Sequence, residues 1–500
     1  MRRSTRRFAR KAAIIALIAT LGGCSVGPDF APPDPHLPEK SFFGKPEPAV
    51  LEPDRPPSLD AQWWRQFRDP TLASLIARAT EANLDVRVAT ERLWQSRAQR
   101  NAAAAALLPT INASAPYTRE LMSQNGLIAL GSAFNNGQPI PYIPPFSLWQ
   151  SGFDASWEID LWGHVRRQVE AAEAQAESSE YQARDTLIAT IAELARDYAD
   201  LRGAEAEIAI TKANLASAEE IAHWTKMRAE KGVGNYLDVE SAEAQVESTR
   251  AQLPALLSRE SAMIDAIGRL VDEPPLALRG ELARGGPQLF TPPRPPVGLA
   301  SDLARRRPDI RRAEAELHAA TANIGVAVAE FYPTFKFNGS MNVNALDARK
   351  LFQATSLQYQ LGPSLSVPIF DGGRLKSQLE LRDAQAREAA LNYHKTVLTA
   401  WTEVVDALVA YRAEVERHAR LKAQAAHQRE ALMLARARYD KGVSPFLNVL
   451  DAQRSVLQAE LQEAQSRTSL GTDLVTLYKA LGGGWEETLP SASSSEGAGG

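Results

Sequence analysis

The chain has 500 residues, with 56 Lys and Arg against 60 Asp and Glu and a formal net charge of −4. This balance disfavours nucleic acid as a partner, because nucleic-acid binding draws on an excess of basic side chains. Cys24 is the only cysteine, so an intrachain disulfide and a cysteine-ligated zinc site are excluded. No run of 18 or more apolar residues occurs, so any membrane-spanning part is expected to be β.

The N-terminus has the order of a secretory signal. A basic head precedes a short apolar run from Ala12 to Leu21, which is too short to cross a bilayer as a helix. The run ends in Gly22-Gly23-Cys24, which resembles a bacterial lipobox, and in that resemblance Ser25 in place of Asp favours sorting to the outer membrane. We therefore expect cleavage of residues 1–23 and attachment of diacylglycerol and an N-acyl chain to Cys24. The alternative is an ordinary secretory signal with an incidental cysteine.

Two parts of the chain share a pattern at a fixed offset of 210 residues. Lys231-Gly232-Val233 recurs as Lys441-Gly442-Val443, and the same shift matches Gly163 with Gly373. Self-similarity of this kind indicates an internal duplication. The expected organisation is a signal peptide at 1–23, a lipidated extended segment at 24–60, a first repeat at 61–272, a Pro-rich linker at 273–297, a second repeat at 298–482 and a disordered tail at 483–500.

Each repeat contains segments in which apolar and polar residues alternate. The clearest are Trp149–Leu161, Phe335–Val343 and Leu357–Ile369. Alternation over about 10 to 13 residues predicts strands long enough to cross a bilayer when tilted. We expect β-hairpins at about 109–161 and 333–369, the first with a polar loop around 125–146. A soluble half-buried sheet gives the same alternation, and the lipobox and the long polar loop favour the membrane.

After each strand pair the apolar period becomes that of a helix. Heptad spacing, which predicts coiled coils, runs through Leu187, Ile191, Leu194, Tyr198 and Leu201 and again through Val397, Trp401, Val404, Leu408, Tyr411 and Val415. No proline interrupts these segments, so each predicts a helix about 100 Å long. A shorter helix is expected after each Lys-Gly-Val turn, interrupted by Pro254 in the first repeat. The hairpin tips then fall at about 229–236 and 440–446.

The predicted strands are too few to form a closed structure in one chain. Four strands cannot close a barrel, so the chain is expected to oligomerise. Three copies supply 12 strands, which is wider than the roughly eight at which side chains fill the interior. The predicted fold class is therefore α+β and internally duplicated, with long helical hairpins next to β-hairpins that form a barrel only when several chains assemble.

The mature chain resembles the TolC-like outer-membrane efflux proteins, and within them the NodT-type lipoprotein branch that includes OprM-like channels. The runs that carry the resemblance are Cys24-Ser25-Val26-Gly27-Pro28-Asp29-Phe30, Trp63-Trp64-Arg65-Gln66-Phe67-Arg68-Asp69-Pro70-Thr71-Leu72, Ser156-Trp157-Glu158-Ile159-Asp160-Leu161-Trp162-Gly163, Arg306-Arg307-Pro308-Asp309-Ile310-Arg311-Arg312-Ala313-Glu314, Pro368-Ile369-Phe370-Asp371-Gly372-Gly373-Arg374 and Leu450-Asp451-Ala452-Gln453. The resemblance implies a homotrimer in the outer membrane, in which four strands per chain form a 12-stranded transmembrane β-barrel. This barrel is continued into the periplasm by a long α-helical coiled-coil barrel. It also implies assembly with a periplasmic adaptor and an inner-membrane transporter of the RND type.

The resemblance assigns adaptor contact to the two hairpin tips. The matching turns are Gly232-Val233-Gly234 and Gly442-Val443-Ser444. The glycines also have a purely structural explanation, because a tight turn needs residues that tolerate positive φ.

A periplasmic gate is implied just beyond the second tip. Leu447 and Asp451 lie at i and i+4 on one helix face, and Arg454 is placed to pair with Asp451. We hypothesise that Asp451 helps to hold the channel shut. An exposed ion pair without a gating role is the alternative. Because Ser241 stands at the matching position of the first repeat, the acidic ring is expected from the second hairpin alone.

Signatures of catalysis and metal binding are missing from the sequence. The seven histidines form neither a zinc-binding HExxH pair nor a Ser-His-Asp signature. Glu220 and His223 match half of a helical di-iron motif, but a second Glu-x-x-His does not occur. We therefore expect no enzyme activity, no metal and no cofactor beyond the lipid on Cys24.

The predicted function is the outer-membrane exit duct of a tripartite efflux system, which passes small molecules passively from a pump to the exterior. The alternatives are a structural periplasmic coiled-coil lipoprotein, the outer-membrane duct of a secretion system and a lipid-anchored enzyme. The membrane strands favour a pore, since a scaffold does not require them. The sequence does not identify the cargo.

Overall fold

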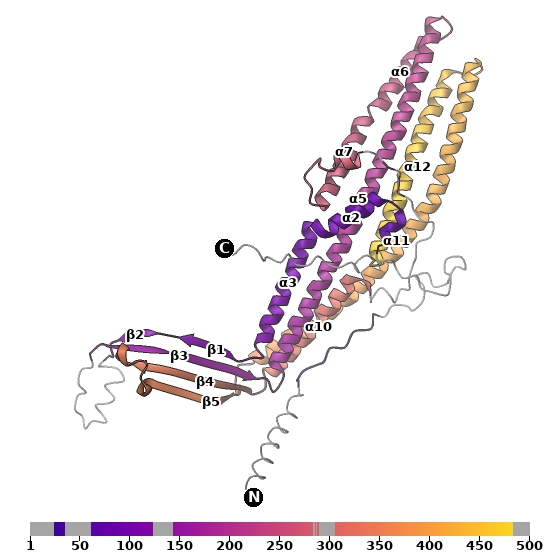
Figure 1. Cartoon of the computed structure of the whole chain (residues 1–500). Helices are drawn as coiled ribbons and strands as arrows, with labels where there is room; N and C mark the ends of the chain where they lie inside the picture. The colour runs from indigo at the N-terminus through magenta and orange to yellow at the C-terminus, as the bar shows by residue number, and fades with distance from the viewer. Residues whose placement is uncertain are drawn as a thin grey trace, which may run out of the picture. The chain divides into compact units, whose positions relative to one another are not determined.

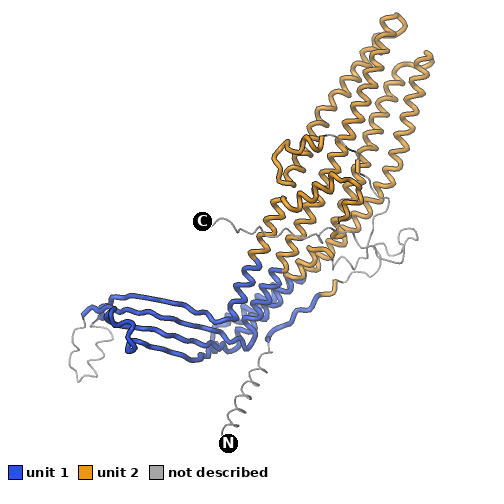
Figure 2. Tube along the Cα trace, viewed as in Figure 1, with its two compact units in different colours: residues 1–32, 96–176, 316–390 blue, residues 33–95, 177–315, 391–500 orange. Residues whose placement is uncertain are grey.

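The computed structural model describes residues 25–35, 62–123, 144–283, 286, 288–289 and 306–483. Cys24, most of the expected loop at 125–146, much of the linker at 273–297 and residues 484–500 lie outside the described residues. Contacts between Cα atoms divide the chain into two units, and Figure 2 colours them separately. Unit 1 comprises Met1–Pro32, Ser96–Ala176 and Glu316–Ala390, and unit 2 comprises Pro33–Gln95, Glu177–Ala315 and Leu391–Gly500.

An antiparallel sheet is the main feature of unit 1 (Figure 1). Its strands are β1 (Thr110–Ser114), β2 (Tyr117–Glu120), β3 (Phe146–Ile159), β4 (Thr334–Ala345) and β5 (Leu357–Ser366). The order is β1-β3-β4-β5, with β2 also paired to β3. The central pair of β3 and β4, which joins the two repeats, runs from Trp149 opposite Ala345 to Ile159 opposite Phe335.

The first of the four predicted strands is present in two segments. Residues 115 and 116 separate β1 from β2, and both segments pair with β3. Pro116 has no N–H to contribute to the ladder. Its carbonyl still accepts a hydrogen bond from Gln150 N at 3.0 Å. The first predicted strand therefore still pairs with β3 on both sides of the break.

The two longest helices are α5 (His164–Glu230) and α11 (Arg374–Asp440), each of 67 residues. Each follows a glycine with positive φ, Gly163 at 84° and Gly373 at 91°, where the chain turns from strand to helix. At 1.5 Å per residue each helix is about 100 Å long, as the proline-free heptads predict.

The return helices differ between the repeats. In the first repeat α6 (Tyr236–Arg250) ends shortly before Pro254, and α7 (Leu253–Leu270) begins with that proline in its first turn. In the second repeat α12 (Phe446–Ala480) continues for 35 residues. The other helices among the described residues are η1 (Trp63–Phe67), α2 (Pro70–Ala82), α3 (Leu84–Ala105), α8 (Arg279–Leu282), α10 (Pro308–Ala329), η3 (Ala348–Lys350) and η4 (Ala354–Ser356).

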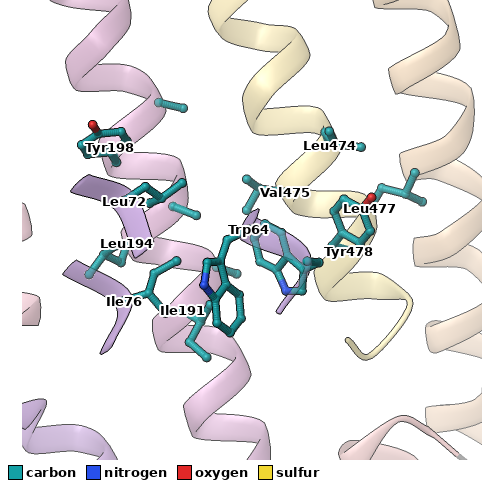
Figure 3. Packing of buried hydrophobic residues seen from close by; sticks show 14 of the residues in the cluster. Trp64, Leu72, Ile76, Ile191, Leu194, Tyr198, Leu474, Val475, Leu477 and Tyr478 are labelled. Atoms are coloured by element: carbon teal, nitrogen blue, oxygen red, sulfur yellow. The ribbon is translucent and has the colours of Figure 1, made fainter. Parts of the chain in front are cut away.

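The main core lies in unit 2, where η1 and α2 pack between the long helices (Figure 3). Trp63 stacks on Tyr478 of α12 with ring centroids 5.0 Å apart. Asp69 caps α2 by accepting from Thr71 N at 2.9 Å and also accepts from the Tyr198 hydroxyl at 2.8 Å. Trp63 and Asp69 thus hold η1 and α2 against α5 and α12.

The predicted heptads supply much of this core. Leu187, Leu194 and Leu201 are fully buried, as are Val404 and the neighbouring Leu408 at 0% and 2% exposure. Trp401 is only half-buried, and Val415 is 38% exposed. Heptad spacing therefore predicts the packed face of α5 well, and that of α11 only in its central part.

Candidate functional site

The sheet has an apolar face that is exposed in the single chain. Phe153, Met341 and Tyr359 form one cross-strand row and are 59%, 57% and 78% exposed. Leu361 and Leu365 on β5 extend the same face and are 70% and 58% exposed. A contiguous exposed apolar surface marks contact with lipid or with another protein. Strands of this length with one apolar face are typical of membrane barrels.

The opposite face of the sheet is polar and internally hydrogen-bonded. Asn112 Nδ2 donates to Asp154 Oδ2 at 3.0 Å across β1 and β3. Asn338 on β4 accepts from Ser156 Oγ at 3.0 Å and donates to Ser364 Oγ at 3.0 Å. These bonds fix the polar side chains in rows, while the outer strands β1, β2 and β5 each have one edge without a strand partner among the described residues.

Both hairpin tips in unit 2 are built in the same way. In the first, Gly232 N donates to Ala229 O and Val233 N donates to Arg228 O, each at 3.0 Å. In the second, Gly442 N donates to Tyr439 O at 2.8 Å and Val443 N to Arg438 O at 3.0 Å. This pair of bonds is the Schellman ending of a helix, with glycine in the left-handed conformation at φ 74° and 70°.

The two tips also present the same side chain. Val233 and Val443 are each 67% exposed, although an apolar residue at this position of a Schellman ending frequently packs back on its helix. Gly234 and Ser444 follow and complete the turns. Each tip therefore ends in an exposed valine that is held by its own backbone bonds.

The three predicted gate residues lie together on the first turns of α12. Leu447 is 59% exposed, and Asp451 and Arg454 are exposed as well. The expected pair between Arg454 and Asp451 is wrong. Arg454 Nε donates instead to Gln245 Oε1 of α6 at 2.7 Å, and the Asp451 carboxylate makes no hydrogen bond or ion pair with another described residue. The buried amide of Gln245, 6% exposed, gives the guanidinium an acceptor on the other hairpin.

Further contacts join the two hairpins behind the tips. The guanidinium of Arg228 on α5 lies over the ring of Tyr439 on α11, 4.7 Å from its centroid. Arg436 on α11 is hydrogen-bonded to Ser217 on α5. Asn214 and Gln245 carry no heptad or motif signal, and their partners lie more than 200 residues away in the sequence. Sequence reasoning therefore missed these links.

Half-buried and buried carboxylates gather along the unit 2 part of α5. Burial, followed by the charges of Glu193 and Asp200, raises the pKa of Asp197 to about 6. Burial also raises the pKa of Asp200 and of Glu207. This segment therefore holds acidic groups that are costly to ionise.

In the described part of the chain, no group of three or more His, Cys, Asp or Glu side chains is arranged to hold a metal ion. None of the described helices is both long and apolar enough to cross a membrane.

Comparison with known proteins agrees with this geometry. The sequence model of the family described as "Outer membrane efflux protein" matches residues 75–262 and 299–483. Nodulation protein T of Rhizobium leguminosarum bv. viciae is 34% identical over 478 residues, covering 96% of this chain and 94% of that protein. Outer membrane protein OprJ of Pseudomonas aeruginosa is 32% identical over 486 residues, covering 96% of each. The solved structure of the outer-membrane channel OprN superposes with a TM-score of 0.84 at 32% identity, covering 93% of this chain and all of that one.

The fold and the two-faced sheet define an outer-membrane channel protein. The chain belongs to the outer membrane efflux protein family. The predicted fold class, family and outer-membrane location are thereby confirmed.

Proposed function

We propose that three copies of this chain form the exit duct of a tripartite efflux system. The observation that carries the proposal is the sheet, with one exposed apolar face, one hydrogen-bonded polar face and unpaired outer edges. Edges of this kind require partners, and three chains supply 12 strands. The apolar face then meets lipid and the polar face lines a water-filled lumen.

The duct works by geometry rather than by chemistry. Family membership supports a channel role, and neither a catalytic residue nor a cofactor is needed for passive passage. Energy comes from an inner-membrane transporter, of the RND type by resemblance, to which a periplasmic adaptor couples the duct. The lipid on Cys24 is a second anchor beside the barrel. The cargo is a small molecule chosen by the transporter.

We assign adaptor contact to the tips. The support is the exposed valine at each, Val233 and Val443, flanked by the turn residues Gly232, Gly234, Gly442 and Ser444. Burying a valine stabilises an interface by about 1.5 to 3 kcal/mol, so two valines per chain form a useful apolar anchor.

We assign the gate to the start of α12. Leu447 and Asp451 supply an exposed apolar and an exposed acidic group, and Arg454 supplies a bond to the neighbouring hairpin. Opening requires the two hairpins to separate near their tips, which breaks the bond between Arg454 and Gln245. Three copies of Asp451 add a ring of negative charge at the opening.

Conductance in planar lipid bilayers tests the channel and the gate together. Purified wild-type protein is expected to open rarely, and Asp451→Ala to open more often. If the two proteins open equally rarely, Asp451 has no role in the gate, and the proposal of a channel is unaffected. A structural coiled-coil lipoprotein, the main alternative, produces no current from any variant.

A further inference from the structure

Residues 25–30, which we call the strap, lie against helices α5 and α10 of unit 1. Val26 N donates to Trp162 O at 3.0 Å, and Val26 O accepts from Arg167 Nε at 3.3 Å. Both backbone polar groups of Val26 are therefore satisfied by this part of the fold. The strap begins directly after Cys24, the residue to which we assign the lipid.

The buried guanidinium of Arg167 forms hydrogen bonds with the strap. Arg167 on α5 has a side chain only 4% exposed, and its Nη2 donates to Asp29 Oδ1 at 2.6 Å. Its Nη1 donates to Glu170 Oε2 at 2.7 Å. A buried guanidinium is stable only when its charge and donors are matched. The Asp29 side chain is 91% exposed, so packing does not fix its position. Its bond to Arg167 does.

Glycines make room for the strap at its closest approaches. A Cβ on Gly27, which has φ 90°, would lie 2.5 Å from the Cα of Gly325 on α10. A Cβ on Gly325 would in turn lie 2.9 Å from the Arg167 side chain. At the turn between β3 and α5, a Cβ on Gly163 would lie 2.8 Å from Ser25 Oγ. Side chains at Gly27 and Gly163 would push the strap away from the helices, and one at Gly325 would displace the Arg167 side chain that binds the strap.

The far end of the strap is held by an aromatic contact. The ring of Phe30 stacks on His318 of α10, with centroids 4.3 Å apart and an interplanar angle of 15°. His318 Nε2 lies 3.1 Å from Glu170 Oε1, and Glu170 is bonded to Arg167. The residues that hold the two ends of the strap thus form one connected network.

We propose that this strap site fixes the lipid-bearing N-terminus at the junction of β3 and α5. The inference rests on the proposed lipid at Cys24. Ser25 lies against Gly163 and directly follows the lipid attachment point in the sequence, so docking of the strap ties that point to this junction. Without the strap site, the chain from Cys24 to Gln62 could span about 125 Å. The strap turns a long tether into a fixed anchor beside the sheet, so that the acyl chains enter the membrane next to the end of β3.

Thiol labelling of purified, membrane-reconstituted protein tests whether the strap is held. The sulfur of a lipidated Cys24 is a thioether, so Val26→Cys introduces the only free thiol of the chain. Val26 is half-buried, and we expect slow reaction with a maleimide. The added changes Asp29→Ala and Phe30→Ala alter only the strap and leave its site on the helices intact. They are expected to speed labelling at least tenfold.

Controls separate loss of the strap from loss of the fold. Asp29→Glu with Phe30→Tyr preserves the charge and the ring and is expected to restore slow labelling. A reporter at exposed Glu177→Cys, in a chain that keeps Val26, is expected to react equally fast with or without the Asp29 and Phe30 changes. Equal labelling of Val26→Cys in the intact and doubly changed straps overturns the proposal.

The lipid is checked by the mass of the N-terminal peptide, which is expected to carry diacylglycerol and an N-acyl chain in every variant. An unmodified Cys24 in the natural chain also overturns the proposal. Conductance is expected to be unchanged by the Asp29 and Phe30 substitutions. Labelling is measured independently of current. If none of the proteins produces current in a bilayer, that result contradicts the proposed channel and not the strap.

Discussion

Arg454 on α12 donates a hydrogen bond to Gln245 on α6 at 2.7 Å, and this bond joins the two helical hairpins of one chain behind their tips. The second repeat supplies the guanidinium and the first supplies the amide. At the offset of 210 residues the corresponding positions are Ala244 and Ser455, so the link is made once and not twice. The duplication has diverged at the point where movement of the hairpins opens the proposed gate.

Arg454→Ala is expected to open the channel more often. A hydrogen bond to a charged group contributes about 1.5 to 3 kcal/mol, so its loss from the closed state alone raises the ratio of open to closed by about tenfold or more. Gln245→Ala is expected to have a similar effect. Single-channel recordings in planar bilayers measure the open probability of each variant.

Arg429→Ala is the matched control for Arg454→Ala. Arg429 on α11 pairs with Glu460 and Glu463 on α12, so its contacts stay within the second hairpin. Its removal is expected to leave the open probability unchanged. If Arg429→Ala opens the channel as much as Arg454→Ala, the effect is a general loosening of the helices and the specific link is refuted.

The tip valines are expected to govern binding of the adaptor. Val443→Asp places a charge in an apolar contact and is expected to weaken binding at least tenfold, with Val233→Asp acting likewise. Thermal unfolding of the helices is expected to be unchanged, because both valine side chains are exposed. Binding is measured with the adaptor recovered with the natural chain by cross-linking. Val443→Leu keeps an apolar tip and should bind normally, so a binding loss in that variant would count against the assignment.

Arg307 is expected to be a major source of stability in unit 2. It is 7% exposed and donates to Ala480 O at 2.9 Å and to Asp309 Oδ2 and Glu403 Oε2 at 2.7 Å each. Arg307→Ala leaves these acceptors without their donor and should cost about 3 kcal/mol. Denaturant unfolding followed by circular dichroism measures the change. Arg306→Ala, at a less buried neighbouring position, should change stability by no more than about 0.5 kcal/mol.

Asp197 is expected to make stability depend on pH. Burial raises its pKa to about 6, above the value of 3.8 for the free side chain. The folded state therefore binds this proton more tightly, and the free energy of unfolding falls as pH rises from about 4 to 6 and is level above that. Asp197→Asn removes the penalty and should stabilise the protein by about 1 to 2 kcal/mol at pH 7.5, after allowance for solvent screening.

Thermal unfolding between pH 4 and 8 measures the effect of Asp197→Asn. The stability of the substituted protein relative to the natural one should increase from pH 4 to about pH 6, and the two should converge at low pH. Glu240→Gln, at an exposed position, serves as the control and should leave the profile unchanged. An Asn variant with the natural pH profile would show that Asp197 is already protonated, or well solvated, throughout.

Local features of the fold were predictable from the sequence. The positive φ of Gly232 and Gly442 follows from a glycine at the end of a helix, and the interruption before α7 follows from Pro254, because both effects act within one turn of the chain. The break at Pro116 has the same local cause and was readable in principle. The alternation in β3 and β4 predicted their faces, since side-chain direction has a period of two.

Contacts between distant segments were not predictable in the same way. Arg454 has Asp451 at a favourable spacing on its own helix, but its side chain reaches Gln245 on another helix. Gly27 and Gly325 each look like ordinary small residues until the strap and α10 come together. Such pairs depend on how helices are placed by the whole core, and heptad or motif patterns do not encode that placement.

The central claim is that this chain forms a channel through the outer membrane, and current through purified Arg454→Ala protein in a planar lipid bilayer tests it most directly. This variant is chosen because its gate is expected to open without the adaptor. The account predicts discrete, long-lived current steps, larger in number than those of the natural chain. Silent bilayers, with the strands inserted and protected from protease, would contradict it.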